Sequence, residues 1–65
     1  MYTSLDDLPN NVRQRVIAVG EIDPRAWVLQ AIPALDNKSI VEVMNEQDGL
    51  VQVLRFLQQV IGHFS

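Results

Sequence analysis

The sequence contains no cysteine, so the chain itself has neither a disulfide nor a thiolate metal site. Basic residues are also few, because five Lys and Arg stand against eight Asp and Glu and give a formal net charge of −3. A nucleic-acid-binding face needs a surplus of basic side chains, so we expect no binding of DNA or RNA by this chain alone. The absence of cysteine fits a cytoplasmic protein, and that is the expected location.

Long apolar runs are missing as well. No stretch approaches the roughly 20 residues of a membrane-spanning helix, so no association with a membrane is expected. Residues 1–7 are acidic and lack the basic start and apolar block of a signal peptide. The three glycines are isolated from one another, which excludes a glycine-rich phosphate-binding loop.

The apolar content is nevertheless high for so short a chain. Its 65 residues make one domain, residues 1–65, of which 48% are apolar. A chain of this length buries only about 60% of the surface that it exposes when unfolded, so its own core gives marginal stability. A homodimer or a bound protein partner is therefore a natural way to bury the remaining apolar surface.

The longest regular pattern lies in residues 49–64. Apolar side chains recur there at the period of one helix face, and polar side chains fall on the opposite face. Asp48 precedes the pattern, where its side chain is expected to cap free backbone N–H groups. We expect a long amphipathic helix on which the rest of the chain packs. The apolar face comprises Leu50, Val53, Leu54, Leu57, Val60, Ile61 and Phe64, and the polar face comprises Gln52, Arg55, Gln59 and His63.

Three shorter helices are predicted before it from their end signals. The first occupies residues 9–20, because proline suits a first turn and glycine is a frequent C-cap. The second occupies residues 24–32, between an Asp-Pro start and a proline that cannot continue it. The third occupies residues 40–44 and follows a Ser-x-x-Glu capping box. The predicted fold is thus all-α, a small four-helix domain with a long amphipathic C-terminal helix.

Side chains that could carry catalysis are sparse. His63 is the only histidine and lies near the end of the chain, where an exposed polar role is expected. The acidic residues at 6–7 and 46–48 are expected to cap helices and face solvent. A chain this small also has little room for a substrate pocket of roughly 300–1,000 Å³. We therefore expect no enzyme activity, no cofactor and no metal site.

Binding roles remain to be compared. A helix-turn-helix would use residues 40–44 and the long helix, but that helix offers DNA only one arginine and two glutamines, without basic residues for phosphate contacts. Val51 and Phe56 lie on opposite flanks of the apolar band of the long helix. They either cover neighbouring helices or extend a surface for a protein partner or a second copy. A protein-binding module is the favoured interpretation, and a small self-associating or adaptor domain is the alternative.

Short motifs follow one another in a fixed order from residue 27 to residue 64. They are Trp27-Val28, Pro33-Ala34-Leu35, Lys38-Ser39, Val41-Glu42-Val43-Met44, Gly49, Val53 and Phe56-Leu57, continued by Val60 and Phe64. In this order and spacing they resemble the toxin-binding domain of Xre/MbcA/ParS-like antitoxins, which belong to RES–Xre toxin–antitoxin systems. The pair Asp36-Asn37 stands where that family has a Gly-Gly turn.

The resemblance implies an antitoxin-like domain that binds and neutralises a RES-domain toxin, an ADP-ribosyltransferase-like enzyme that depletes cellular NAD. The antitoxin would cover the entrance of the toxin's active site. Such antitoxins usually carry an N-terminal DNA-binding region, which this chain is too short to include. Contacts with the toxin are then expected on the polar face and tail of the last helix. The residues expected to bind this partner are Arg55, Gln59, His63, Phe64 and Ser65.

Overall fold

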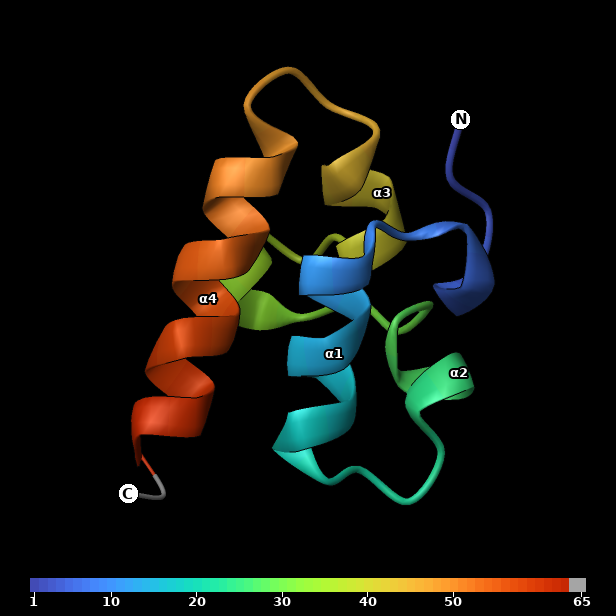
Figure 1. Cartoon of the computed structure of the whole chain (residues 1–65). Helices are drawn as coiled ribbons and strands as arrows, with labels where there is room; N and C mark the ends of the chain where they lie inside the picture. The colour runs from blue at the N-terminus through green and yellow to red at the C-terminus, as the bar shows by residue number, and fades with distance from the viewer. Residues whose placement is uncertain (64–65) are drawn as a thin grey trace.

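The computed structural model describes residues 1–63, and these form a helical fold (Figure 1). Its elements are the 3₁₀ turn η1 (Leu5–Asp7), α1 (Asn10–Val19), α2 (Pro24–Trp27), the 3₁₀ turn η2 (Pro33–Leu35), α3 (Ile40–Met44) and α4 (Gly49–His63). The described residues contain no β-strand, and a single isolated bridge joins Ile32 to Lys38. The predicted all-α class with four helices is confirmed for this part of the chain.

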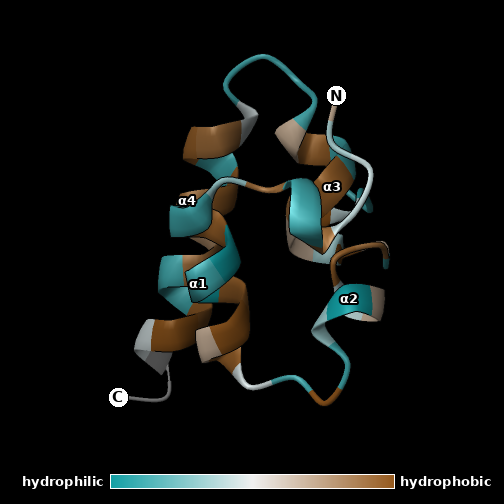
Figure 2. Ribbon diagram, turned by 45° about the vertical axis from the view of Figure 1, so that its right-hand side comes forward, coloured by the Kyte–Doolittle hydropathy of each residue, from teal (hydrophilic) through white to brown (hydrophobic). Residues whose placement is uncertain are grey.

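Helix α4 is the element against which the others pack. Helices α1 and α4 lie side by side and run in the same direction, and α3 and η2 also contact α4 (Figure 1). Figure 2 shows hydrophobic and hydrophilic residues alternating along α1 and α4, as one-sided burial requires. Val53 and Leu57 are fully buried, whereas Leu50 is 41% exposed. The predicted apolar face is therefore buried at its centre, as expected, whereas its first turn is partly exposed to solvent. With 15 residues, α4 is only moderately longer than α1.

The core is apolar apart from one hydroxyl group. Ser39 is buried at the start of α3, and its side-chain oxygen accepts the backbone N–H of Glu42 at 3.1 Å. This bond is the predicted N-cap, and it satisfies a polar group that would otherwise be costly to bury. Helix α2 contributes no buried residue. The buried apolar side chains are Leu5, Leu8, Val12, Val16, Val28, Leu35, Ile40, Val41, Val43, Met44, Val53 and Leu57.

The predicted caps of α2 and α4 have different outcomes. The Asp23 carboxylate accepts the backbone N–H of Ala26 at 3.2 Å, so this N-cap is confirmed. Asp48 instead has a left-handed backbone with a φ of 63°, and within residues 1–63 its side chain makes no hydrogen bond to the first turn of α4. Its carbonyl oxygen accepts the N–H of Gln52 at 3.3 Å. The prediction of an Asp48 side-chain cap was therefore wrong. The left-handed turn at Asp48 leads directly into α4, and the backbone carbonyl of Asp48, rather than its side chain, accepts the N–H of Gln52.

Helix α2 is shorter than predicted. It ends at Trp27, and the N–H groups of Leu29 and Gln30 then bond three residues back in tighter turns. Ile32 is extended, with φ −116° and ψ 119°, because the residue before a proline disfavours the helical backbone. The N–H of Ile32 then donates to the carbonyl of Lys38 at 3.1 Å, which closes residues 32–38 into a loop. This loop carries η2, which contacts α4.

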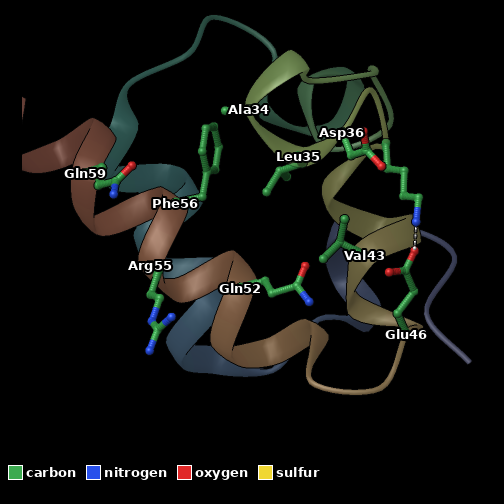
Figure 3. A pocket seen from close by; sticks show the side chains of 10 residues that line it. Ala34, Leu35, Asp36, Val43, Glu46, Gln52, Arg55, Phe56 and Gln59 are labelled. Carbon is green, nitrogen blue, oxygen red and sulfur yellow. Dashed lines mark hydrogen bonds and ion pairs between the residues drawn. The ribbon is translucent and has the colours of Figure 1, made fainter.

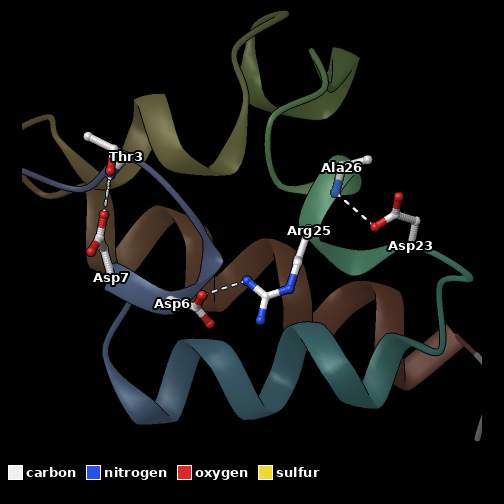
Figure 4. A network of polar contacts seen from close by, with 6 residues as sticks. All are labelled: Thr3, Asp6, Asp7, Asp23, Arg25 and Ala26. Carbon is white, nitrogen blue, oxygen red and sulfur yellow. Dashed lines mark hydrogen bonds and ion pairs between the residues drawn. The ribbon is translucent and has the colours of Figure 1, made fainter.

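Polar contacts order the N-terminal segment and join it to α2 (Figure 4). Thr3 donates its backbone N–H and its hydroxyl to the carboxylate of Asp7. Arg25 of α2 pairs with Asp6 at 2.6 Å. The Arg25 hydrogen bond is the main cause that lowers the pKa of Asp6, and the Thr3 hydroxyl is the main cause that lowers the pKa of Asp7. Both carboxyl groups are therefore ionised more readily in the folded chain than in the unfolded one.

Acid is expected to weaken these contacts. Because the folded pKa of Asp7 is depressed below its ordinary value of 3.8, its ionisation contributes stability above that value, and the contribution disappears as the pH falls through the folded pKa. Asp7→Asn should flatten the fall in melting temperature between about pH 5 and about pH 2. Thermal denaturation followed by circular dichroism measures this profile. Glu21→Gln is the control, since that exposed side chain makes no hydrogen bond within residues 1–63. An acid profile unchanged by Asp7→Asn would contradict the role of Asp7.

Candidate functional site

A groove lies between one flank of α4 and the segment that leads from η2 into α3 and just beyond it (Figure 3). It is open to solvent and has a volume of about 360 Å³. We call it the α4 groove. Its α4 wall consists of Gln52, Arg55, Phe56 and Gln59, and its opposite wall consists of Ala34, Leu35, Asp36, Lys38, Val43 and Glu46.

Helical periodicity brings the α4 wall together. Residues separated by three or four positions are neighbours on a helix surface, so Gln52, Arg55 and Gln59 follow one another along the groove. All three side chains are exposed, and Phe56 between them is half-buried. Two predicted partner-binding residues, Arg55 and Gln59, thus lie together on this wall. Gln52 and Phe56 were not among the predicted contacts, although both line the same surface.

Phe56 connects the groove to α2. Its ring stacks on that of Trp27, with the ring centroids 6.2 Å apart and an angle of 27° between the planes. This arrangement fixes one side of Phe56 against the core while the residue still lines the groove. Of the two residues outside the main apolar stripe, Phe56 therefore covers a neighbouring helix, whereas Val51 remains 50% exposed.

A turn with unusual backbone geometry shapes the opposite wall. Asp36 and Asn37 both have a φ of 62°, in the left-handed region that glycine adopts most readily. The N–H of Asn37 donates to the carbonyl of Ile32 at 3.1 Å, which holds the turn closed. At the end of this wall Lys38 Nζ pairs with Glu46 Oε2 at 2.8 Å. The Glu46 hydrogen bond is the main cause that raises the pKa of Lys38, so this positive charge is already matched within the chain.

Arg55 is the basic residue of the groove that lacks such a match. Within residues 1–63 its guanidinium makes no hydrogen bond or ion pair, and the amide groups of Gln52 and Gln59 likewise make none. Every other Lys and Arg side chain donates a hydrogen bond inside the chain. These bonds join Arg13 to Asn10, Arg15 to Asn11, Arg25 to Asp6 and Lys38 to Glu46. The α4 wall therefore presents a row of donors that are available to another molecule.

The remaining predicted contacts lie at the end of α4. His63 is the last helical residue, and its side chain falls outside the description, as do Phe64 and Ser65 entirely. In the described part of the chain, His, Cys, Asp and Glu side chains do not gather in a group that could hold a metal ion. None of the described helices has the length and apolar character needed to cross a membrane.

The opposite wall could not be found from sequence periodicity, because its residues belong to a loop and a short helix that meet α4 only after folding. The sequence signals for the groove were all on α4, namely Arg55 and Gln59 on its polar face and the apolar Phe56 on its flank. No protein-family model, curated protein or solved structure matches the chain. The groove is therefore interpreted from its own geometry and charges.

Proposed function

We propose that the chain is a non-catalytic protein-binding module that holds its partner in the α4 groove. The observation that carries the proposal is the exposed Arg55, which has no partner within residues 1–63 and stands beside an aromatic ring and two free amides. Arginine and aromatic side chains are enriched among residues that dominate binding energy at protein interfaces. The groove volume of about 360 Å³ lies within the range of small-molecule pockets, contrary to the expectation of little room. The groove is open to solvent, however, and that suits a segment of a protein chain better than a small substrate that must be enclosed.

We propose further that the partner is a RES-domain toxin whose NAD-depleting activity is blocked in the complex. The ordered motifs of residues 27–64 support this version through their resemblance to the antitoxin domain. The turn at Asp36-Asn37 adds support, because both residues adopt a backbone suited to the Gly-Gly pair that the family has there. Gly49 adds further support, since it occupies the glycine position of the motif and comes close to the backbone of Val43.

Arg55→Ala tests this proposal. We expect it to weaken binding to the RES-domain toxin by roughly 30-fold, because a residue that dominates an interface costs about 2 kcal/mol when truncated. Calorimetry measures the affinity, and NAD consumption by the toxin reports the loss of inhibition. The melting temperature should stay unchanged, since the side chain is exposed and makes no hydrogen bond or ion pair within residues 1–63 that truncation would break.

The matched control for Arg55→Ala is Arg15→Ala, which removes an exposed arginine of α1 that does not line the α4 groove. This variant should bind the toxin as the unaltered chain does. If the unaltered chain, the Arg55→Ala variant and the Arg15→Ala variant bind the toxin with equal affinity, the contact lies outside the α4 groove. If the unaltered chain does not bind RES-domain toxins, the proposal that such a toxin is its partner is rejected.

Self-association is the second candidate function, and the exposed start of α4 favours it. Leu50 and Val51 are 41% and 50% exposed, and Leu54 one turn later is only half-buried. If a second copy covers this surface, the melting temperature should rise with protein concentration, because dimerisation stabilises by mass action. Thermal denaturation over an approximately hundredfold concentration range measures the effect. A constant melting temperature would exclude this function.

A further inference from the structure

The charges of the α4 groove are arranged asymmetrically. The α4 wall carries the guanidinium of Arg55, which is without a partner in the described chain, whereas Glu46 already matches the positive charge of Lys38. Asp36 adds a negative charge to the wall opposite Arg55. Arg55 and Asp36 are thus the two unpaired charges of the groove within the described residues, and a group that binds on the α4 wall meets the positive one. The planar fork of guanidinium N–H donors fits a carboxylate, with which it can form two parallel hydrogen bonds.

The spacing of the other donors indicates an extended occupant. From Gln52 to Gln59 the α4 wall spans seven residues, or about 10 Å at 1.5 Å per residue. An extended chain covers that distance with about three residues. A segment lying along α4 can place a carboxylate on Arg55 while its backbone carbonyls accept hydrogen bonds from the amides of Gln52 and Gln59.

The apolar part of the groove adds a second requirement. Phe56 is held in place by its stack on Trp27, and Ala34 faces it from the opposite wall (Figure 3). An apolar side chain next to the carboxylate would bury surface against both residues. On the opposite wall the charge of Glu46 is matched by Lys38, whereas the unpaired Asp36 would repel further negative charge. These features disfavour a nucleic acid or a long acidic run.

We propose that the α4 groove recognises an extended segment of a protein partner in which a single Asp or Glu stands close to an apolar residue. The carboxylate binds Arg55, and the apolar side chain packs beside Phe56 and Ala34. This inference rests on the proposed protein-binding function and adds the chemistry of the segment that is bound.

Selection from a random peptide library displayed on phage tests the inference with the chain alone. Peptides enriched by the unaltered chain should share one Asp or Glu near an apolar residue. Arg55→Gln should weaken their binding at least tenfold, and so should replacing the peptide carboxylate by an amide. Arg15→Gln, which removes the same charge away from the groove, should leave the affinity within about twofold. In ¹⁵N-labelled protein the peptide should shift amide signals of residues 34–38 and 52–59.

Other outcomes would overturn the inference. These are the absence of enriched peptides, enriched peptides without a carboxylate or with runs of acidic residues, and equal binding by the Arg55→Gln variant. Competition by millimolar inorganic phosphate as effective as that by the peptide would also overturn it, since it would indicate a site for any anion. Because no toxin is used, these failures are separate from failure of the toxin proposal, which is decided by the NAD assay.

Discussion

Replacing Gly49 by alanine is expected to destabilise the protein strongly. A Cβ atom at this position would lie 2.7 Å from the carbonyl carbon of Val43 and 3.1 Å from the Cα of Met44, and closer still to the Val43 oxygen. These are backbone atoms of α3, so no side-chain rotation relieves the clash. Only a separation of α3 from α4 would make room, and that separation would open the core.

The size of the Gly49→Ala effect follows from the small total stability of the domain. Extra atoms in a packed interior cost about 1–3 kcal/mol, and more where backbone must move. At roughly 0.05–0.15 kcal/mol per residue, a chain of 65 residues has a stability of about 3–10 kcal/mol, so a single change of this size removes a large part of it. We expect a loss of at least about 3 kcal/mol. Urea denaturation followed by circular dichroism measures it.

Gly62 provides the control within the same helix. A Cβ atom there would meet nothing within 4 Å, so Gly62→Ala should keep or raise the stability, by up to about 1 kcal/mol from helix propensity. A similar loss in both variants would mean that alanine disturbs α4 itself rather than its contact with α3. A fully stable Gly49→Ala protein would contradict the close approach of the two helices.

The sequence predicted features that depend on neighbouring residues. The Asp23 cap and the Ser39 half of the capping box formed as expected, because such a cap requires only a side chain and the N–H groups two or three residues later. The other half of the box did not form, since within residues 1–63 the Glu42 side chain makes no hydrogen bond to the N–H of Ser39. The buried centre of α4 was also predicted, since the 3.6-residue period is a local property. The fold class followed from these signals.

Features that depend on packing between different helices were not predicted. The close approach of Gly49 to Val43 and the stack of Trp27 on Phe56 join different helices, and no local pattern encodes either contact. The early end of α2 was missed because Pro33 was read as its stop, although the chain had already left the helix after Trp27. Of the residues that line the groove, the helix period placed Arg55 and Gln59 on the polar face of α4, and the family resemblance singled them out as contacts. The opposite wall belongs to segments that meet α4 only on folding.

Leu57→Ala is expected to lower the free energy of unfolding by about 2–5 kcal/mol. Leu57 has no exposed surface and lies on α4 one turn after Val53, which is equally buried. Truncation would remove apolar contacts and leave a cavity that the surrounding helices can fill only partly. Urea denaturation should show a lower midpoint with an unchanged slope, because the surface exposed on unfolding stays nearly the same.

Leu50→Ala is the matched control, since it makes the same chemical change two turns earlier on α4 at a side chain that is 41% exposed. In a monomer its cost should be well below that of Leu57→Ala, because much of the removed surface already faces water. If Leu57→Ala cost as little as Leu50→Ala is expected to cost in a monomer, the buried face of α4 would be assigned wrongly. Equally large losses would mean that Leu50 is covered in solution. A second copy packed on the first turn of α4 would have that effect, and its contribution would then diminish on dilution. The pair of variants thus separates the packing of the core from self-association.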